Sequence, residues 1–386
     1  MSSIKPPQKD ADIGMGAYVS GEQGIGGMLK SEPEDFVVAE IMEDGTRLSI
    51  TEDMGGDDLA GEYTHFTMVK RNWETMRAIK EMAKRLGVSR GRFSYAGTKD
   101  KRALTAQRVS AHRIGAEKLA AVSMTDITIK DIGYDDDRLG LGCLWGNAFS
   151  IRLRGVADGA AEAIEKISDE VAAGFPNYFG HQRFGDIRPV THIVGKRIIE
   201  SDLEGAVMAY LCEFDERETE DSLSARKRLA QKKDYGDALR YFPRRLGYEV
   251  AMLNKLAVDP VDFKGALESM PRGLQSMFIH AYQSWVFNRA LTRCIDDGLT
   301  VERLPLVGAD TEPDPISAGI LSADGIKVSD FDRAPLESMR SKGWERDCFV
   351  AAEDLEVRLE GDDALFDFSL GKGSYATVLL REFTKD

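Results

Sequence analysis

The 386-residue chain lacks the cysteine and histidine patterns of disulfide-bonded and metal-binding proteins. Its four cysteines lie far apart and form no C-x-x-C pair, which argues against both a disulfide framework and a cysteine-based zinc site. The five histidines are equally scattered, and none belongs to an H-E-x-x-H or H-x-E…P-C-x-x-C pattern. We therefore expect no metal and no metal-dependent chemistry.

Long apolar runs and nucleotide-binding loops are missing as well. No stretch approaches 18 consecutive apolar residues, and the polar start MSSIKPPQKDADIGMG lacks the apolar core of a signal peptide, so we expect a cytoplasmic protein without a membrane segment. The stretch GEQGIGGMLKS (21–31) fails as a phosphate loop, because Leu29 stands where the second glycine is required. We interpret residues 1–30 as a flexible arm.

The charge of the chain is distributed unevenly. A net charge of −14 argues at first against a nucleic-acid partner. Residues 70–113, however, hold 13 Lys and Arg against three acids, a local charge of +10 on a body that is otherwise acidic. Such a patch would attract a polyanion locally. The alternative is a solvated helix face with ordinary loops.

Hydrophobic patterning predicts strands at both ends of the chain and helices between them. Strands are expected at 35–41, 65–70 and 146–155, where Phe149, Ile151 and Leu153 alternate with polar residues. An amphipathic helix is expected at 73–86, with Asn72 as its N-cap and Gly87 as its stop. Helical periodicity prevails from about 190 to 348, and strand character returns in LEVRLE and ALFDFSL. The sequence therefore predicts an α+β fold in which a mostly helical domain interrupts a sheet domain.

Two groups of acids are candidates for chemistry. Asp100 in AGTKDKRALTAQ (96–107) is flanked by Lys99 and Lys101, which favour its ionised form and suit a nucleophile or base rather than a general acid. It is expected on a loop between two extended segments; local chemistry alone favours a salt-bridged structural turn. The second group, Asp131 with residues 135–137, fits a solvated hairpin turn better than a cation site.

The Asp100 stretch resembles the G-x-K-D-[KR]-x-A-x-T-x-Q signature of the TruD family of tRNA pseudouridine synthases. Four further segments resemble that family in the same order: SEPEDFVVAEI (31–41), GNAFSIRLR (146–154), FPNYFGHQRFG (175–185) and GSYATVLLRE (373–382). The resemblance implies a curved, mainly antiparallel sheet domain at 31–184 and 349–386, with a TruD-specific insert at 185–348. It also implies an isomerase without a cofactor that detaches a uridine of tRNA at its N1–C1′ bond, rotates it and rejoins it through C5.

The resemblance also implies roles for individual residues. Asp100 would be the nucleophile, with Lys99 and Lys101 keeping it charged and attracting phosphates. Phe36 and Tyr375 would contact the flipped uridine, and Asn147 would bind the substrate or orient Asp100. Further substrate or RNA contacts are expected from Phe149 and from the basic residues Arg77, Lys80, Lys84, Arg85 and Arg102, and basic clusters of the insert (226–228, 232, 233, 244 and 245) are further candidates.

Phe149 occupies the place where other pseudouridine synthases are thought to use tyrosine, so the group that removes the C5 proton is left open. Position 13 of tRNA is the first candidate target, as in archaeal-type members, and no obligatory protein partner is inferred. Other functions remain as alternatives. One is a non-catalytic RNA-binding chaperone of the same fold, against which the Lys99–Asp100–Lys101 trio argues. Another is a methyltransferase or deaminase, against which the missing glycine-rich fingerprint and zinc ligands argue.

Overall fold

The computed structural model describes residues 4–56, 61–332 and 337–386. The chain divides into two compact units, each built from separate stretches. The sheet unit comprises Glu22–Phe175 and Ala351–Asp386, and the helical unit comprises Met1–Gly21 and Pro176–Val350. The domain boundaries expected from the sequence stay a prediction, while the units of the structure change at Gly21, Phe175 and Val350.

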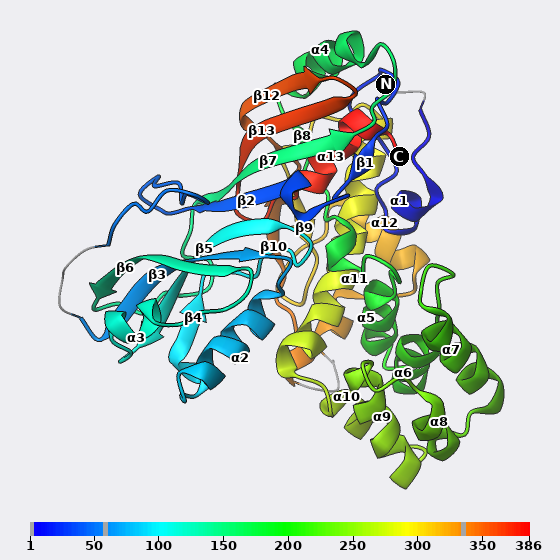
Figure 1. Ribbon diagram of the computed structural model, residues 1–386. Helices are drawn as coiled ribbons and strands as arrows, with labels where there is room; N and C mark the ends of the chain where they lie inside the picture. Colours follow the sequence, from blue (N-terminus) through cyan, green and yellow to red (C-terminus); the bar gives the residue numbers. More distant parts are fainter. Residues whose placement is uncertain (1–3, 57–60, 333–336) are drawn as a thin grey trace. The chain divides into compact units, whose positions relative to one another are not determined.

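The sheet unit is built on one nine-stranded sheet with the order β12-β13-β7-β2-β5-β3-β6, to which β1 and β4 add at β7 and β5 (Figure 1). Among the strand pairs described for this sheet, only that of β2 with β5 is parallel. The strands are β1 (Met28–Leu29), β2 (Phe36–Ile41), β3 (Tyr63–Arg71), β4 (Phe93–Tyr95), β5 (Leu104–His112), β6 (Ile127–Asp135), β7 (Gly146–Arg154), β12 (Glu353–Glu360) and β13 (Asp363–Gly371). The predicted α+β class with a mainly antiparallel sheet is confirmed.

Side-chain alternation explains the strand that runs through the middle of this sheet. In β7, Phe149, Ile151 and Leu153 are buried, whereas Ser150, Arg152 and Arg154 are partly exposed. The alternation has the period of two that a strand requires, and the predicted strand at 146–155 is confirmed to within one residue. Because β7 lies between β2 and β13, its buried apolar side chains have strand neighbours on both sides.

The helices of the sheet unit are α2 (Thr75–Arg85), α3 (Ala116–Ala120), α4 (Ala160–Val171) and α13 (Ala376–Thr384). Helix α2 buries Ile79 and Met82 against Phe66 and Met68 of β3. Its N-cap is Glu74, whose carboxylate accepts hydrogen bonds from the Met76 and Arg77 amides at 2.8 Å. The predicted N-cap was wrong, because Asn72 has a φ of 56° and its amide bonds to the Ala103 carbonyl.

The acid cluster at 131–137 also differs from expectation. Asp131 lies inside β6, is buried, and accepts a hydrogen bond from the Met54 amide at 2.6 Å. Only its companions at 135–137 fit the predicted turn, where the Asp137 amide bonds to the Asp135 carboxylate at 2.9 Å. The four acids are therefore not one site: the buried Asp131 binds the amide of an exposed loop residue, Met54.

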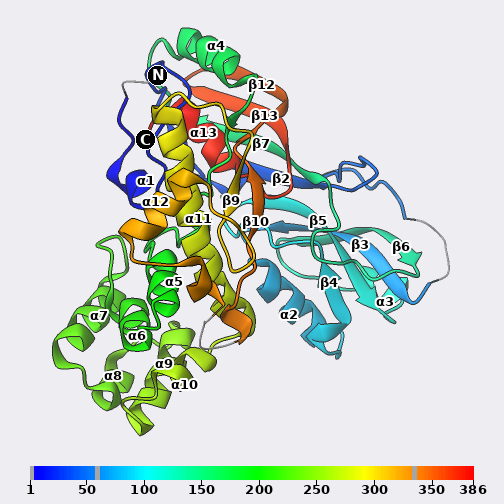
Figure 2. The same cartoon turned by 180° about the vertical axis from the view of Figure 1, so that it is seen from behind.

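The helical unit contains the long helix α11, which Figure 2 shows from the opposite side. It lies within the span of about 190–348 for which helical periodicity was predicted. The helices are α1 (Gln8–Asp12), α5 (Thr191–Ile199), α6 (Leu203–Cys212), α7 (Glu220–Lys232), α8 (Tyr235–Tyr241), α9 (Gly247–Val258), α10 (Phe263–Glu268), α11 (Arg272–Asp296) and α12 (Pro315–Ala323), with strands β9 (Arg303–Leu306) and β10 (Trp344–Asp347); β8 (Phe175–Pro176) and β11 (Phe349–Val350) stand near the chain crossings.

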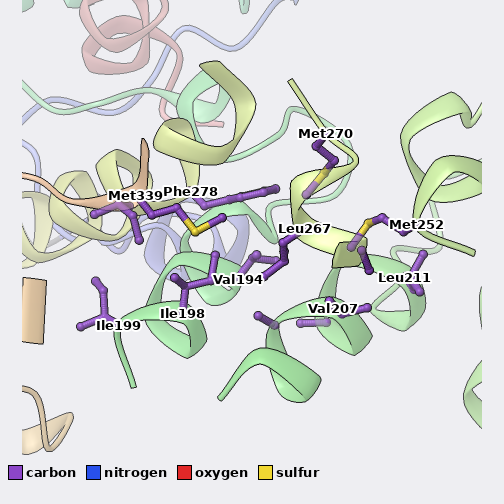
Figure 3. Close-up of a cluster of buried hydrophobic side chains, with 14 of the residues drawn as sticks. Val194, Ile198, Ile199, Val207, Leu211, Met252, Leu267, Met270, Phe278 and Met339 are labelled. Carbon is purple, nitrogen blue, oxygen red and sulfur yellow. The ribbon is translucent and has the colours of Figure 1, made fainter. Parts of the chain in front are cut away.

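One apolar core holds the helical unit together. Figure 3 shows side chains of α5, α6, α9, α10 and α11 that converge in it, including Val194, Val207, Met252, Leu267 and Phe278. Their burial from five helices explains why this part of the sequence shows helical periodicity in nearly every segment. Among the described residues, none of the helices is long and apolar enough to span a bilayer.

The N-terminal segment is packed rather than loosely held. Ile13 and Tyr18 are buried, and the Asn288 side chain of α11 donates to the Ile13 carbonyl at 2.9 Å. The Thr292 hydroxyl donates to the Gly14 carbonyl at 2.7 Å, and His181 pairs with Asp10 at 2.7 Å. The expectation of a free arm missed these contacts because each joins residues more than 150 positions apart, which local composition does not show.

Candidate active site

One face of the sheet gathers the residues singled out by the sequence motifs. Along β2, Phe36 and Glu40 point to the same face, because alternate residues of a strand do so. Their partners on the antiparallel neighbour β7 are Ile151 and Asn147, and Phe149 lies opposite Val38. The predicted residues Phe36, Asn147 and Phe149 therefore share a single face, together with the buried carboxylate of Glu40.

Asp100 lies on the loop between β4 and β5, as predicted. Strand β5 runs parallel to β2 with Leu104 opposite Val37, so the loop reaches the sheet beside the start of β2. There the Asp100 carboxylate accepts a hydrogen bond from the Lys30 ammonium at 3.1 Å. The same ammonium lies 4.0 Å from the centroid of the Phe36 ring. Asp100 thus meets two residues from a much earlier part of the chain, Lys30 lying 70 positions before it.

Lys30 was missed by the sequence interpretation. It belongs to the stretch assigned to a flexible arm, yet Met28 and Leu29 pair with Arg154 and Leu153 of β7, and this short strand places Lys30 near the site. Lys30 itself has a φ of 57°. The usable signal was its position directly before the segment 31–41, which carries Phe36.

Lys99 makes a different contact from the one expected. Its ammonium bonds to Glu40 at 2.6 Å, and its side chain is only 7% exposed. The buried Lys99–Glu40 pair therefore anchors the loop to the sheet, and Lys30 supplies an ion pair to Asp100 itself. Lys101 is exposed. Adjacent residues of an irregular loop point in different directions, so flanking position alone did not identify the cation on Asp100.

Buried polar side chains fix the loop around Asp100. Gln107 of β5 donates to the Gly97 carbonyl at 3.1 Å and accepts from the Thr75 hydroxyl at 3.0 Å. The Thr75 oxygen in turn accepts from the Lys99 amide at 3.1 Å. Lys70 donates to the Asp100 carbonyl at 2.8 Å, and burial lowers the pKa of Lys70 to about 8. Such a network restricts the position of a reactive group more tightly than a loop without these hydrogen bonds would.

Aromatic rings and one amide complete the sheet face. Phe36 meets Phe149 edge-on with ring centroids 6.2 Å apart, and Phe149 stacks on Phe368 at 5.2 Å. Both rings of the first pair are buried. The side-chain oxygen of Asn147 is buried and has no hydrogen-bond partner among the described residues. A buried acceptor of this kind is costly unless a ligand or water donates to it.

Tyr375 is the residue before α13 and is partly exposed. It follows the end of β13, where Leu370 lies opposite Asn147. The register therefore places Tyr375 five residues beyond the position that pairs with Asn147, at the same end of the sheet. Its proposed contact with a uridine stays a prediction.

The basic residues of α2 lie on one exposed side of that helix. Arg77, Lys80, Lys84 and Arg85 are all exposed, and Arg85 also pairs with Glu81 at 3.0 Å. Arg102 stands near Asp100 in the loop and donates to the Ser31 carbonyl at 3.3 Å. The sheet unit thus presents a cationic helix and a cationic loop.

The basic clusters of the helical unit have another arrangement. Arg226 is buried, and its guanidinium bonds to Glu218 at 3.0 Å and to Glu249 at 2.7 Å. It was wrongly included among the candidates for RNA contact, because a run of basic residues on an amphipathic helix can turn one member inward. Arg228 and Arg245 are exposed and pair with Asp237 and Asp221.

Comparison with known proteins shows the family to which this chain belongs. The family model described as tRNA pseudouridine synthase D (TruD) matches residues 12–308 and 303–383, nearly the whole chain. The chain belongs to the TruD family. This confirms the resemblance inferred from the five motifs and the isomerase class that it implied.

Relatives and a solved structure extend the match over the full length. A curated protein of Methanosarcina mazei called "Probable tRNA pseudouridine synthase D" is 34% identical, with 99% of this chain and 98% of that protein covered. One of Halobacterium salinarum with the same name is 35% identical, with 97% and 96% covered. A crystal structure of a TruD protein from Methanosarcina mazei matches with a TM-score of 0.77 at 33% identity, covering 99% of this chain and 98% of that one.

Proposed function

We propose that this chain converts uridine to pseudouridine in tRNA, most directly at position 13, and that Asp100 is the nucleophile. The observation that carries the proposal is the Asp100 loop: a partly exposed carboxylate paired with Lys30 and held by buried groups of the sheet. A nucleophile must be reachable, and the Asp100 side chain is 25% exposed. TruD membership supplies the reaction class.

The residues around Asp100 suit the steps of this reaction. The target base must leave the RNA stack, and apolar rings beside the carboxylate give it a surface to contact. Phe36 and Phe149, which pack edge-on, are the rings proposed to form this surface when the base enters. The unpartnered oxygen of Asn147 would accept a hydrogen bond from an N–H or O–H group of the nucleotide. Tyr375 is assigned a further contact with the base.

The cationic side of α2 supports a polyanionic substrate. Arg77, Lys80 and Lys84 expose their charge in the unit that carries Asp100. Phosphate contacts would hold the RNA while the sheet face acts on one nucleotide. The fixed carboxylate favours an enzyme over a non-catalytic chaperone, since a binding module gains nothing from an anion facing phosphates.

The proposal is tested by incubating the purified protein with unmodified tRNA transcripts and mapping pseudouridine by carbodiimide-blocked primer extension. The wild type is expected to form pseudouridine at position 13 without added cofactor, and D100N to be slower by at least about 10³-fold. D136N is the matched control, because Asp136 is exposed in the turn after β6. No product from the wild type, or full activity in D100N, would contradict the proposal.

A transcript with cytidine at position 13 tests the target separately. If pseudouridine then appears nowhere, position 13 is the site of reaction. If product forms at another uridine in the normal transcript and is unaffected by this change, the reaction class stands and the assigned position is wrong.

A further inference from the structure

A buried lysine, Lys70, contacts the main chain of Asp100 and takes no part in the chemical steps proposed above. Lys70 is on β3, and its side chain is fully buried. Its ammonium donates to the carbonyl of Trp73 at 2.8 Å, to that of Asp100 at 2.8 Å and to that of Lys99 at 3.4 Å. A lysine ammonium has three N–H donors, so these three carbonyls use all of them.

The three carbonyls belong to two separate segments of the chain. Trp73 lies just before α2, and the other two carbonyls belong to the Asp100 loop between β4 and β5. The ammonium thus links the Asp100 loop to the segment that leads into α2. The Thr75 hydroxyl oxygen links the same segments by accepting a hydrogen bond from the Lys99 amide at 3.1 Å. Burying an unpaired ammonium is expensive, and main-chain carbonyls alone do not neutralise it.

The charged surroundings of Lys70 are few. Asp100 and Glu74 favour its protonated form, whereas Lys99 and burial oppose it. Thr105 of β5 and Ile127 of β6, which lie opposite Lys70 on the two neighbouring strands, carry no charge. Of these groups, the proposed reaction uses only Asp100. Its carboxylate attracts the Lys70 ammonium electrostatically, so the charge of Lys70 depends on the reactive group.

We propose that Lys70 is a positioning residue whose ammonium holds the main chain of Asp100 in the geometry needed for attack. This inference rests on the proposed function and adds to it a residue that need not touch the substrate. Without the positive charge, one of three carbonyl contacts is lost and the amine presents a lone pair toward the oxygens. Small displacements of a reacting group are costly, on the order of 10²-fold in rate for about 1 Å.

The charge of Lys70 depends on pH. Burial lowers the pKa of Lys70 from 10.5 to about 8, so the charge is present below pH 8 and is lost above it. Because this pKa lies below that of an unfolded lysine, the folded protein releases the proton first, and the contribution of Lys70 to folding stability rises between pH 8 and 10.5. A loss of activity above pH 8 would therefore not be caused by unfolding through this group.

The test compares K70M with the wild type and with K130M. Lys130 is a matched control, because it is also a buried lysine of this sheet, on the adjacent strand β6, and bonds to the Glu52 carbonyl rather than to the Asp100 loop. Single-turnover pseudouridine formation and the Kd for tRNA are measured for each protein from pH 6 to 9.5, with circular dichroism to monitor folding.

K70M is expected to react about 10²-fold more slowly with a Kd for tRNA within threefold of the wild type, and K130M to react within threefold. The wild-type rate should fall above pH 8 while the circular dichroism is constant, and this fall should be absent from K70M. K70R, which stays charged, should recover part of the rate and lack the fall near pH 8. An alkaline loss that comes from the RNA would persist in K70M.

A K70M rate within threefold of the wild type, or an equal loss in K130M, would overturn the inference. So would an identical alkaline limb in the wild type and K70M. If K70M does not fold, the wild-type profile decides: a rate that is constant from pH 7 to 9.5 in folded protein contradicts the role of the charge. An inactive wild type would instead refute the proposed function, so the two failures are distinguishable.

Discussion

The two units both bury charged side chains, but they use them differently. In the helical unit, Arg226 pairs with Glu218 and Glu249, so cations and anions satisfy each other within one core. In the sheet unit, the buried charges of Glu40, Lys70 and Lys99 are directed at the loop that carries Asp100. A buried charge network that holds a loop bearing a partly exposed carboxylate indicates a reactive site, whereas a network closed within the core indicates structure.

The strongest way to break this comparison is to remove one buried carboxylate from each unit. E40Q leaves Lys99 without its anion and should lower the rate of pseudouridine formation about 10²-fold, because the loop loses its anchor. E249Q should leave that rate within threefold. Each variant should lose about 3–5 kcal/mol of unfolding free energy, measured by urea denaturation of the full chain.

Equal activity losses in E40Q and E249Q would contradict the distinction between the two networks. Both variants replace a buried glutamate by its neutral isostere, so the pair is matched in chemistry. An activity loss confined to E40Q would show that activity depends on the buried pair that anchors the Asp100 loop.

A second substitution separates Asp100 from its cation. K30M removes the ion pair and the cation beside the Phe36 ring, and should lower the single-turnover rate by about 10-fold to 10²-fold. Its cost to unfolding free energy should stay below about 1 kcal/mol, because both partners are partly exposed. K166M is the control: Lys166 of α4 forms an exposed pair with Glu162, and its loss should leave the rate unchanged. A K30M rate equal to that of the wild type would remove Lys30 from the site.

The smallest expected effect concerns RNA affinity. The double variant K84E/R85E should weaken tRNA binding at low salt and reduce the slope of log K against log salt, because phosphate contacts release counterions. K232E/R244E changes two exposed cations of the helical unit by the same charge. Binding measured by filter retention should respond more strongly to the α2 variant, and equal responses would show that neither surface is preferred.

Much of the sheet unit was predictable because its signals are local. Alternation identified β7, periodicity identified α2, and the Asp100 stretch was recognised as a loop between strands. The contacts that make the site were not predictable in the same way. Lys30 reaches Asp100 across 70 residues and Lys70 across 30, and such pairings depend on strand register rather than on neighbouring residues.

The direction in which each side chain points was the second property that the sequence did not predict. Lys99 was expected beside the Asp100 carboxylate and instead bonds to Glu40, because the loop turns the two side chains apart. Arg226 was grouped with exposed cations and lies in the core, since it belongs to the buried side of α7 together with Ala225 and Leu229. Sequence motifs identified the residue types of the site, and the fold decided which of them meet.

The most direct measurement is the single-turnover rate of pseudouridine formation by the wild type and D100N, with the protein in excess so that all tRNA is bound. The account predicts product at position 13 with the wild type and a rate at least about 10³-fold lower with D100N, at equal tRNA affinity. A D100N rate within tenfold of the wild type would show that the reaction does not depend on this carboxylate and would contradict the account.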